Sequence, residues 1–417
     1  MKLLHCADIH LGYETHGRLD PETGLNTRLL DFRRCFDFVV ERALAEDVDL
    51  FLFCGDAYRT ADPTPTQQKL FAEALAPLTQ AGIPIVMIVG NHDHPVSFGK
   101  ASSVDIFGHL EGDVHVFRRP SFERVDTKAG PLQLIALPWP IRSLVLSKEE
   151  HRRKSPQEIR ELIERLYGEF VEAHAKRLDP TLPAVLAGHF TVQGAEHAGS
   201  ERASLIAHEP TFTVGQLARP GIDYVALGHI HKYQDRNRDA YERGEGPPVV
   251  YSSSIERISF KEHDAEKGFV LVDIDATPEG KQTTYTFVPT PARRFIPLFV
   301  DAREAPDPTG AILAEIGAHD LTGAVVRVRY QVTEVQAPTI DANAIRNALS
   351  AADTIAAVER FVEPVERKRT TTVRREATLE EALGRYVDQH ENLAALKEDL
   401  LAAALELEQE VDRKSGG

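Results

Sequence analysis

Short apolar stretches alternate with amphipathic ones through residues 1–275. Eight of the apolar stretches are rich in β-branched or aromatic residues and predict strands: Lys2–Cys6, Leu50–Cys54, Ile83–Val89, Leu132–Leu137, Pro183–Ala187, Tyr224–Leu227, Val249–Tyr251 and Gly268–Ile274. Apolar residues at helical spacing predict three helices between them: Leu30–Glu46, Thr66–Gln80 and Pro156–Arg177. This alternation predicts an α/β fold of sheets covered by helices, and so many strands suit two packed sheets.

The pattern changes near residues 276–293, where a turn and two prolines follow the last of these strands. Residues 294–363 then read as a small α+β unit with four elements: strands Phe295–Val300 and Val325–Val332, and helices near Ala311–Gly317 and Ala342–Ala351. A polar, basic stretch and a strongly helical end follow. We therefore expect four parts: a main domain at 1–280, a small domain at 281–365, a linker at 366–377 and a helical tail at 378–417.

Composition narrows the class of protein. With 417 residues the chain is too long for one compact core, and 42% hydrophobic and 27% charged residues are ordinary for a globular protein. No apolar run reaches membrane length, the N-terminus has too few apolar residues for a signal peptide, and three sparse cysteines show no metal spacing. These features predict a cytoplasmic protein without a membrane partner. The net charge of −16 disfavours a protein that coats nucleic acid but does not exclude a nuclease, because bound cations offset acidic ligands.

Five short polar motifs each follow an apolar strand. They are Asp8-Ile9-His10, Gly55-Asp56, Gly90-Asn91-His92-Asp93, Gly188-His189 and Gly228-His229-Ile230-His231. In α/β folds, ligands gather outside the carboxyl ends of strands, so these motifs can converge on one site. A single histidine at a strand end is usually structural, but five such motifs together are a strong signal.

The residue types of the motifs suit a pair of divalent transition metals. Carboxylates, imidazoles and an amide carbonyl give mixed oxygen and nitrogen ligation. Two ions about 3.5–4 Å apart need a bridging carboxylate, and Asp56 is the candidate. Such a pair activates a water and stabilises an in-line displacement at phosphorus. The motifs therefore predict a two-metal phosphoesterase.

The ordered set of motifs resembles the calcineurin-like metallophosphoesterase superfamily. Four further stretches narrow the resemblance to SbcD-type nucleases of DNA double-strand-break repair: Ala7–Gly12, Arg28-x-x-Asp31-Phe32, Ile255-Glu256-Arg257 and Glu266-Lys267-Gly268-Phe269. The resemblance covers the whole chain. It implies a two-sheet sandwich flanked by helices, a small DNA-binding capping domain and a C-terminal helical tail.

The resemblance also implies a role for each motif residue. The first metal would be held by Asp8, His10, Asp56 and His231, and the second by Asp56, Asn91, His189 and His229. His92 would contact the scissile phosphate and assist the leaving oxygen, with Asp93 orienting it. The two divalent ions would be Mn²⁺, with Mg²⁺ as the other candidate.

The implied activity is exonuclease and endonuclease cleavage of DNA ends and hairpins, in a homodimer that works with an SbcC-type ATPase. The tail, where Thr378 and Glu381 form a capping-box pattern, would grip the coiled coil of that ATPase. The tail helices could instead fold back on the protein's own core. Two other functions stay open: a metallophosphoesterase acting on nucleotides, phosphoproteins or lipid headgroups, and a non-catalytic scaffold.

Several residues leave their interpretation open. Where the family usually has an aspartate or histidine after Gly55-Asp56, this chain has Arg59, which suits either a phosphate contact or an exposed surface. Ser252 and Ser253 replace a more usual Pro-Gly, which questions the geometry of that loop. His94 is expected to be a loop residue. A basic cluster suits either DNA phosphates, an acidic partner surface or a plain linker: Arg367, Lys368, Arg369, Arg374 and Arg375.

Overall fold

The structure is a computed structural model that describes residues 1–95, 99–141, 154–200, 209–277, 280–364, 378–388, 393 and 396–415. The expected linker at 366–377 and its basic cluster lie outside these residues. Contacts divide the chain into one unit of residues 1–331 and 339–361 and a second of residues 332–338 and 362–417. Within the described part of the chain, no helix is both long and apolar enough to cross a membrane.

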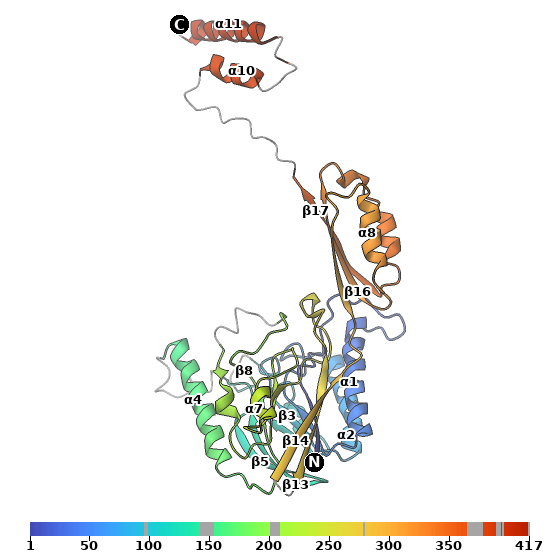
Figure 1. The fold of residues 1–417 in the computed structure, drawn as a ribbon, viewed down its shortest axis with the longest axis vertical. Coiled ribbons are helices and arrows are strands. Elements are labelled where there is room, and N and C mark those ends of the chain that lie inside the picture. The colour runs from blue at the N-terminus through green and yellow to red at the C-terminus, as the bar shows by residue number, and fades with distance from the viewer. Residues whose placement is uncertain are drawn as a thin grey trace. The chain divides into compact units, whose positions relative to one another are not determined.

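Two six-stranded sheets form the centre of the first unit (Figure 1). The first has the order β14 (Gly280–Pro289), β13 (Gly268–Thr277), β1 (Lys2–Cys6), β2 (Leu50–Phe53), β3 (Ile85–Ile88), β4 (Val114–Phe117). The second has the order β11 (Gln234–Asp235), β12 (Val249–Tyr251), β10 (Tyr224–Gly228), β7 (Ala184–His189), β6 (Gly130–Leu137), β5 (Ser121–Thr127). A small pair, β8 (Thr191–Val192) and β9 (Thr211–Phe212), follows β7.

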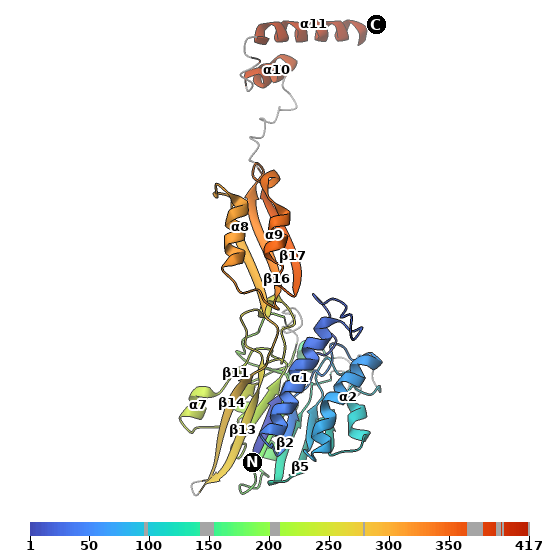
Figure 2. The same cartoon turned by 90° about the vertical axis from the view of Figure 1, so that its right-hand side faces the viewer.

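Successive side chains along each strand point to opposite faces of its sheet, and the buried ones form three hydrophobic layers. Leu3, Leu52 and Val185 face the interior between the two sheets. Leu4 and its equivalents on the first sheet face α1 (Thr27–Ala45) and α2 (Pro65–Gln80), and Leu186 on the second faces α4 (Pro156–Ala175). Figure 1 shows α4 on the side of the sandwich opposite to α1 and α2, and Figure 2 views the α1–α2 layer from the front. The expected two-sheet α/β sandwich is confirmed.

Side-chain caps mark the first residues of the three long helices. The side chain of Asn26 accepts from the backbone at the start of α1, which therefore begins three residues before the expected Leu30. Thr64 and Ser155 make capping boxes at α2 and α4. The described short helices of the main domain are η1 (Asp105–His109), α6 (Val214–Leu217), α7 (Arg238–Glu242) and η3 (Phe260–Glu262).

The small domain contains a three-stranded sheet of β15 (Phe295–Asp301), β16 (Val325–Thr333) and β17 (Thr354–Glu363), with α8 (Pro308–Gly317) and α9 (Ala342–Ala348) on one face (Figure 2). The sequence missed β17 because its apolar residues are weakly patterned. Strand β14, which the expected boundary at residue 281 assigns to the small domain, pairs with β13 along its whole length and belongs to the main sheet. The small domain contacts the main domain through Phe295, which packs on Phe260 of η3.

The second unit contains α10 (Leu379–Asp388) and α11 (Lys397–Ser415), and η4 (Ala337–Thr339) lies at the junction between the units. Thr378 caps α10 by accepting from the backbone N–H of Glu381 at 3.3 Å, as the sequence pattern predicts. The two tail helices contact each other, yet Tyr386, Leu396 and Leu407 stay largely exposed. Residues 389–392, between the two helices, lie outside the described residues.

Candidate metal centre

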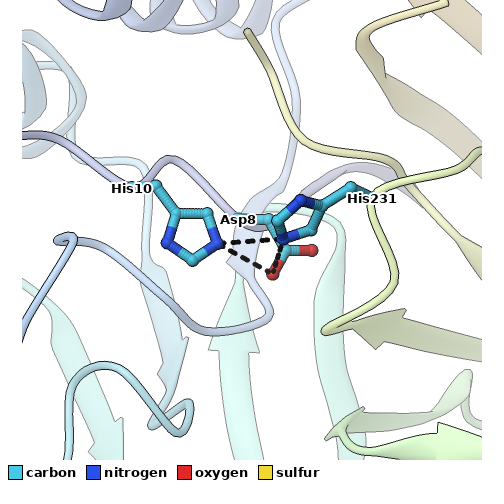
Figure 3. Close-up of side chains that lie close together, drawn as sticks. All are labelled: Asp8, His10 and His231. Atoms are coloured by element: carbon cyan, nitrogen blue, oxygen red, sulfur yellow. Dashed lines mark hydrogen bonds and ion pairs between the residues drawn. The ribbon is translucent and has the colours of Figure 1, made fainter. Parts of the chain in front are cut away.

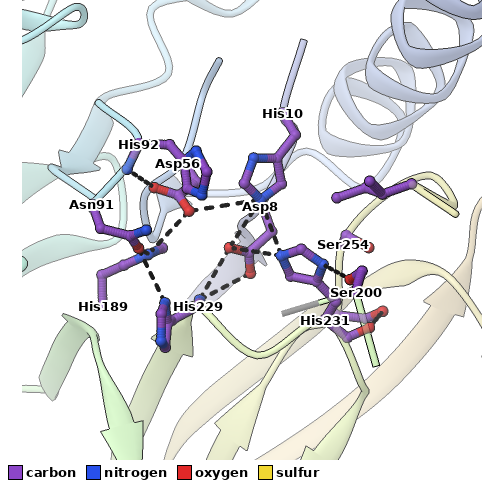
Figure 4. Close-up of polar contacts among 12 residues, drawn as sticks. Asp8, His10, Asp56, Asn91, His92, His189, Ser200, His229, His231 and Ser254 are labelled. Atoms are coloured by element: carbon purple, nitrogen blue, oxygen red, sulfur yellow. Dashed lines mark hydrogen bonds and ion pairs between the residues drawn. The ribbon is translucent and has the colours of Figure 1, made fainter. Parts of the chain in front are cut away.

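The five motifs meet at one edge of the sandwich. Strands β1, β2, β3 and β4 run parallel in the first sheet, and β6, β7, β10 and β12 run parallel in the second. Each motif lies at the carboxyl end of its strand, so the side chains converge as in other α/β folds. Figure 4 shows them facing one another around Asp8 and Asp56.

A first set of ligand atoms surrounds a point between Asp8, His10 and His231 (Figure 3). The Nε2 atoms of His10 and His231 are 3.0 Å apart, and each lies 3.9 Å from Oδ1 of Asp8. Oδ2 of Asp56 is 3.6 Å from the same Nε2 of His10. All four side chains are buried.

A second set lies on the other side of Asp56. Oδ1 of Asn91 is 3.0 Å from Nε2 of His189 and 3.0 Å from Nδ1 of His229. Nε2 of His189 is 3.3 Å from Oδ2 of Asp56. The same carboxylate oxygen of Asp56 therefore faces both sets, as a bridging ligand must.

The spacing of these atoms fits two metal ions. Ligands about 2.1 Å from one ion lie roughly 3–3.5 Å from each other, and the separations here are 3.0–3.9 Å. Imidazole nitrogens mixed with carboxylate and amide oxygens suit divalent transition metals. The cluster fits a binuclear divalent metal site.

Four of the seven predicted ligands hold a left-handed backbone. The φ angles are 54° at Asp8, 51° at His10, 62° at Asp56 and 91° at His229. Each such residue costs about 1–3 kcal/mol and persists only where surrounding contacts enforce it. Here the N–H of Asp8 donates to the carbonyl of Gly55 at 2.9 Å, and that of His10 donates to the carbonyl of Asp56 at 3.0 Å. The fold gives up stability in order to aim these side chains.

Two motif glycines leave room that a side chain would fill. A Cβ on Gly90 would lie 2.2 Å from Oδ1 of Asp56, and one on Gly228 would lie 2.1 Å from the carbonyl oxygen of Cys54. Neither position has a positive φ, so close approach of neighbouring groups alone excludes larger residues.

The electrostatics of the cluster favour positive charge beside Asp56. Burial, only partly offset by His231 and His189, raises the pKa of Asp8 to about 7. Burial alone would also raise the pKa of Asp56. His189 and His92 nevertheless hold the pKa of Asp56 well below its usual range. Burial would lower the pKa of His189, but Asp56 outweighs it and raises that pKa to about 9. A divalent cation supplies the positive charge that this arrangement favours.

His92 lies at the rim of the cluster and is half-buried. Its Nδ1 lies 2.7 Å from the carbonyl oxygen of Arg59, and its backbone N–H donates to Oδ1 of Asp56 at 2.8 Å. One ring nitrogen of His92 also lies within 4.8 Å of ligand atoms of His10 and Asp56. His94 instead bonds the carbonyl of Pro95 and belongs to none of the described ligand groups.

The carboxylate of Asp93, expected to orient His92, bonds backbone groups around the cluster. It accepts from the backbone N–H groups of Gly90 at 3.0 Å, Asp56 at 2.8 Å and Ala57 at 2.9 Å. Because three backbone donors converge on it, Asp93 fixes the two turns that carry Asp56 and His92.

The two departures from the family pattern are accommodated. Ser253 adopts a φ of 78°, a conformation that favours glycine, and its hydroxyl donates to the carbonyl of His231 at 2.8 Å. Ser253 thus holds a backbone conformation that usually needs glycine. Arg59 is exposed, and its guanidinium lies 5.1 Å from the ring centre of Tyr13.

Sequence reasoning missed the groups behind the histidines. Glu209 contacts His229, and Glu262 contacts His231, each at 3.0 Å. Lys267, which belongs to the Glu266-Lys267-Gly268-Phe269 stretch, forms a buried ion pair with Glu262 at 3.0 Å. No spacing in the sequence pairs the two glutamates with the histidines, because one lies just before β9 and the other lies in η3.

Comparisons with known proteins agree with this geometry. The family described as Calcineurin-like phosphoesterase matches residues 1–233. The D subunit of the SbcCD nuclease from Bacillus subtilis (strain 168) is 29% identical over 298 residues, 68% of this chain and 68% of that protein. Its namesake in Escherichia coli (strain K12) is 26% identical over 257 residues, 60% of this chain and 61% of that protein. A dimetal phosphatase structure from Danio rerio, 8% identical, covers 69% of this chain and 98% of that one with a TM-score of 0.37, too weak a likeness to bear on the site.

Proposed function

Because this chain belongs to the calcineurin-like phosphoesterase family, we propose that it is a metal-dependent nuclease that cleaves DNA ends and hairpins as the SbcD component of an SbcCD-type complex. The observation that carries the proposal is the pair of ligand sets that share Asp56. The two relatives named as D subunits of the SbcCD nuclease support the choice of DNA as substrate.

In this proposal, one ion is held by Asp8, His10, Asp56 and His231, and the other by Asp56, Asn91, His189 and His229, with Mn²⁺ as the metal and Mg²⁺ as an alternative. Bound there, the ions supply Lewis acidity and an activated water for in-line displacement at phosphorus. The chain itself contributes preorganised ligands, of which all but Asn91 are buried.

His92 supplies the proton for the departing oxygen. With its Nδ1–H donated to the carbonyl of Arg59, its Nε2 is left to carry that proton. Its half-buried position at the rim suits contact with a phosphodiester that cannot enter a closed pocket. Asp93 acts through the backbone, keeping His92 and Asp56 in register.

The partners follow from the parts outside the metal centre. Tyr386, Leu396 and Leu407 of the tail are exposed, and exposed apolar side chains on helices suit docking on the coiled coil of an SbcC-type ATPase. We place DNA contacts on the small domain, and we expect a homodimer in the cytoplasm.

A nuclease assay tests the proposal. The full chain, loaded with Mn²⁺ or Mg²⁺, is incubated with blunt duplex DNA and with hairpin DNA, with and without an SbcC-type ATPase. Metal-dependent cleavage that the ATPase stimulates is expected. A parallel incubation with p-nitrophenyl phosphate separates the alternatives, since rapid hydrolysis of this monoester without any cleavage of DNA would assign the chain to a phosphomonoesterase instead.

A further inference from the structure

The two histidines of the Gly-His-x-His motif are held from behind by two different carboxylates. Nε2 of His229 lies 3.0 Å from Oε2 of Glu209, and Nδ1 of His231 lies 3.0 Å from Oε1 of Glu262. We infer that Glu209 and Glu262 are positioning residues, each of which sets the affinity for one of the two ions by fixing one histidine. The inference rests on the metal ligands assigned under the proposed function.

The two histidines must adopt opposite tautomers. His231 turns Nε2 toward the first set, so its Nδ1 must carry the hydrogen, and Glu262 and the hydroxyl of Ser200, which itself bonds Glu262, each lie 3.0 Å from that nitrogen. His229 turns Nδ1 toward Asn91 in the second set, so its Nε2 must carry it. A free imidazole exchanges between the two tautomers, and only one leaves the correct nitrogen open to a metal. A carboxylate behind each ring selects that tautomer and fixes the ring plane.

Glu262 is anchored on every side. It is fully buried, Nζ of Lys267 lies 3.0 Å from its Oε2, and the same oxygen accepts from the N–H of Ile258 at 2.9 Å. Lys267 also donates to the carbonyl of His231 at 3.0 Å, so the pair grips both the ring and the backbone of that residue. Phe260, two residues earlier on η3, packs on Phe295 of the small domain.

Glu209 is held more lightly. Its side chain is 12% exposed, whereas that of Glu262 is fully buried. Its segment is tied down two residues later, where the N–H of Thr211 donates to Oε1 of Glu164 at 2.9 Å. Among the described residues Glu262 pairs with a lysine, whereas the ion pair described for Glu209 is with His229 itself, so the His231 ion has the more rigid support.

Metal titration of the full chain tests this inference. Binding of Mn²⁺ is followed by calorimetry and by the EPR signal of free Mn²⁺. The only tryptophan, Trp139, adds an optical readout, because its ring lies 5.1 Å from that of His229 and paramagnetic Mn²⁺ quenches nearby fluorescence. The wild type is expected to bind two ions. Glu209→Gln and Glu262→Gln should each weaken one ion by ~10–100-fold and leave the other unchanged.

Matched controls separate positioning from general damage. Glu164→Gln keeps an oxygen for Thr211 and should bind both ions normally. Glu256→Gln changes another fully buried glutamate, one whose described contacts are with Cys35, Arg28 and backbone N–H groups and not with a metal ligand. Circular dichroism in EDTA verifies folding. If Glu262→Gln does not fold, the pair Glu262→Gln with Lys267→Met carries the same test without a lone buried charge.

A double-mutant cycle gives the decisive result. If Glu262 acts through His231, Glu262→Gln should have no further effect on Mn²⁺ affinity in a His231→Ala background, and likewise Glu209→Gln in a His229→Ala background. Additive losses, or variants that bind like the controls, would overturn the inference. A wild type that binds fewer than two ions would instead overturn the ligand assignment of the proposed function.

Discussion

Replacing Gly90 by alanine should displace the shared ligand of the metal centre. The added Cβ would lie 2.2 Å from Oδ1 of Asp56, about 1.2 Å closer than the 3.4 Å at which ordinary contact begins. It would also lie 2.6 Å from the backbone nitrogen of Asp56, so a side-chain rotation alone cannot relieve the clash. The carboxylate must therefore move by roughly 1 Å, which for a positioned catalytic group can cost ~10²-fold in rate.

The assay measures Mn²⁺ stoichiometry and the rate of DNA cleavage side by side. We expect Gly90→Ala to lose affinity for both ions, because Asp56 faces both sets, and to lose about 1–3 kcal/mol of stability from overpacking. Gly215→Ala is the matched control, since a Cβ there meets nothing within 4 Å. Wild-type metal content and rate in Gly90→Ala would refute the argument that Asp56 must occupy its observed position.

Four other changes test the remaining parts. Asp56→Ala should abolish cleavage and metal binding together; an active variant with two ions would contradict the bridging role. His92→Ala should bind metal and DNA normally but cleave ~10²–10⁴-fold more slowly in single-turnover assays, whereas loss of an ion would make His92 a ligand. Deleting residues 378–417 should leave a folded, metal-loaded nuclease that no longer co-purifies with an SbcC-type ATPase; full-affinity binding or outright unfolding would refute the docking role. Burial lowers the pKa of His5 to about 3, so this neutral histidine contributes stability above pH 6.5 that is lost by about 1.4 kcal/mol per unit as pH falls toward 3. Urea denaturation in EDTA should show that the free energy of unfolding depends less steeply on pH in His5→Gln than in the wild type. An unchanged pH dependence would contradict the role given to His5.

The sequence predicted what depends on local pattern. Strand β1 has the bounds that its apolar run indicates, and Asp8, Asp56 and His189 meet because parallel strands end at one edge. The sequence does not show contacts that form only when the chain folds. Asp93 lies next to His92 in sequence, yet its carboxylate turns to backbone donors of another loop.

Other shortfalls have similar causes. Glu262 stands 31 residues from His231, and no periodicity links a turn of η3 to a strand end. Strand β14 alternates half-exposed with exposed residues, so its weak apolar signal hid that it completes the main sheet. Ser253 shows the opposite case, because a residue that looked incompatible with a tight loop adopts the required backbone and hydrogen-bonds within it.

Each proposed ion has ligands from both sheets. Asp8, His10, Asp56 and Asn91 follow strands of the first sheet, whereas the remaining predicted ligands, His189, His229 and His231, follow strands of the second. Apart from this edge, the sheets are joined mainly by non-directional apolar packing. The proposed metal pair would therefore cross-link the two halves of the sandwich, and its binding energy would add to the free energy of unfolding by mass action. The melting temperature of this protein should then report the free metal concentration around it.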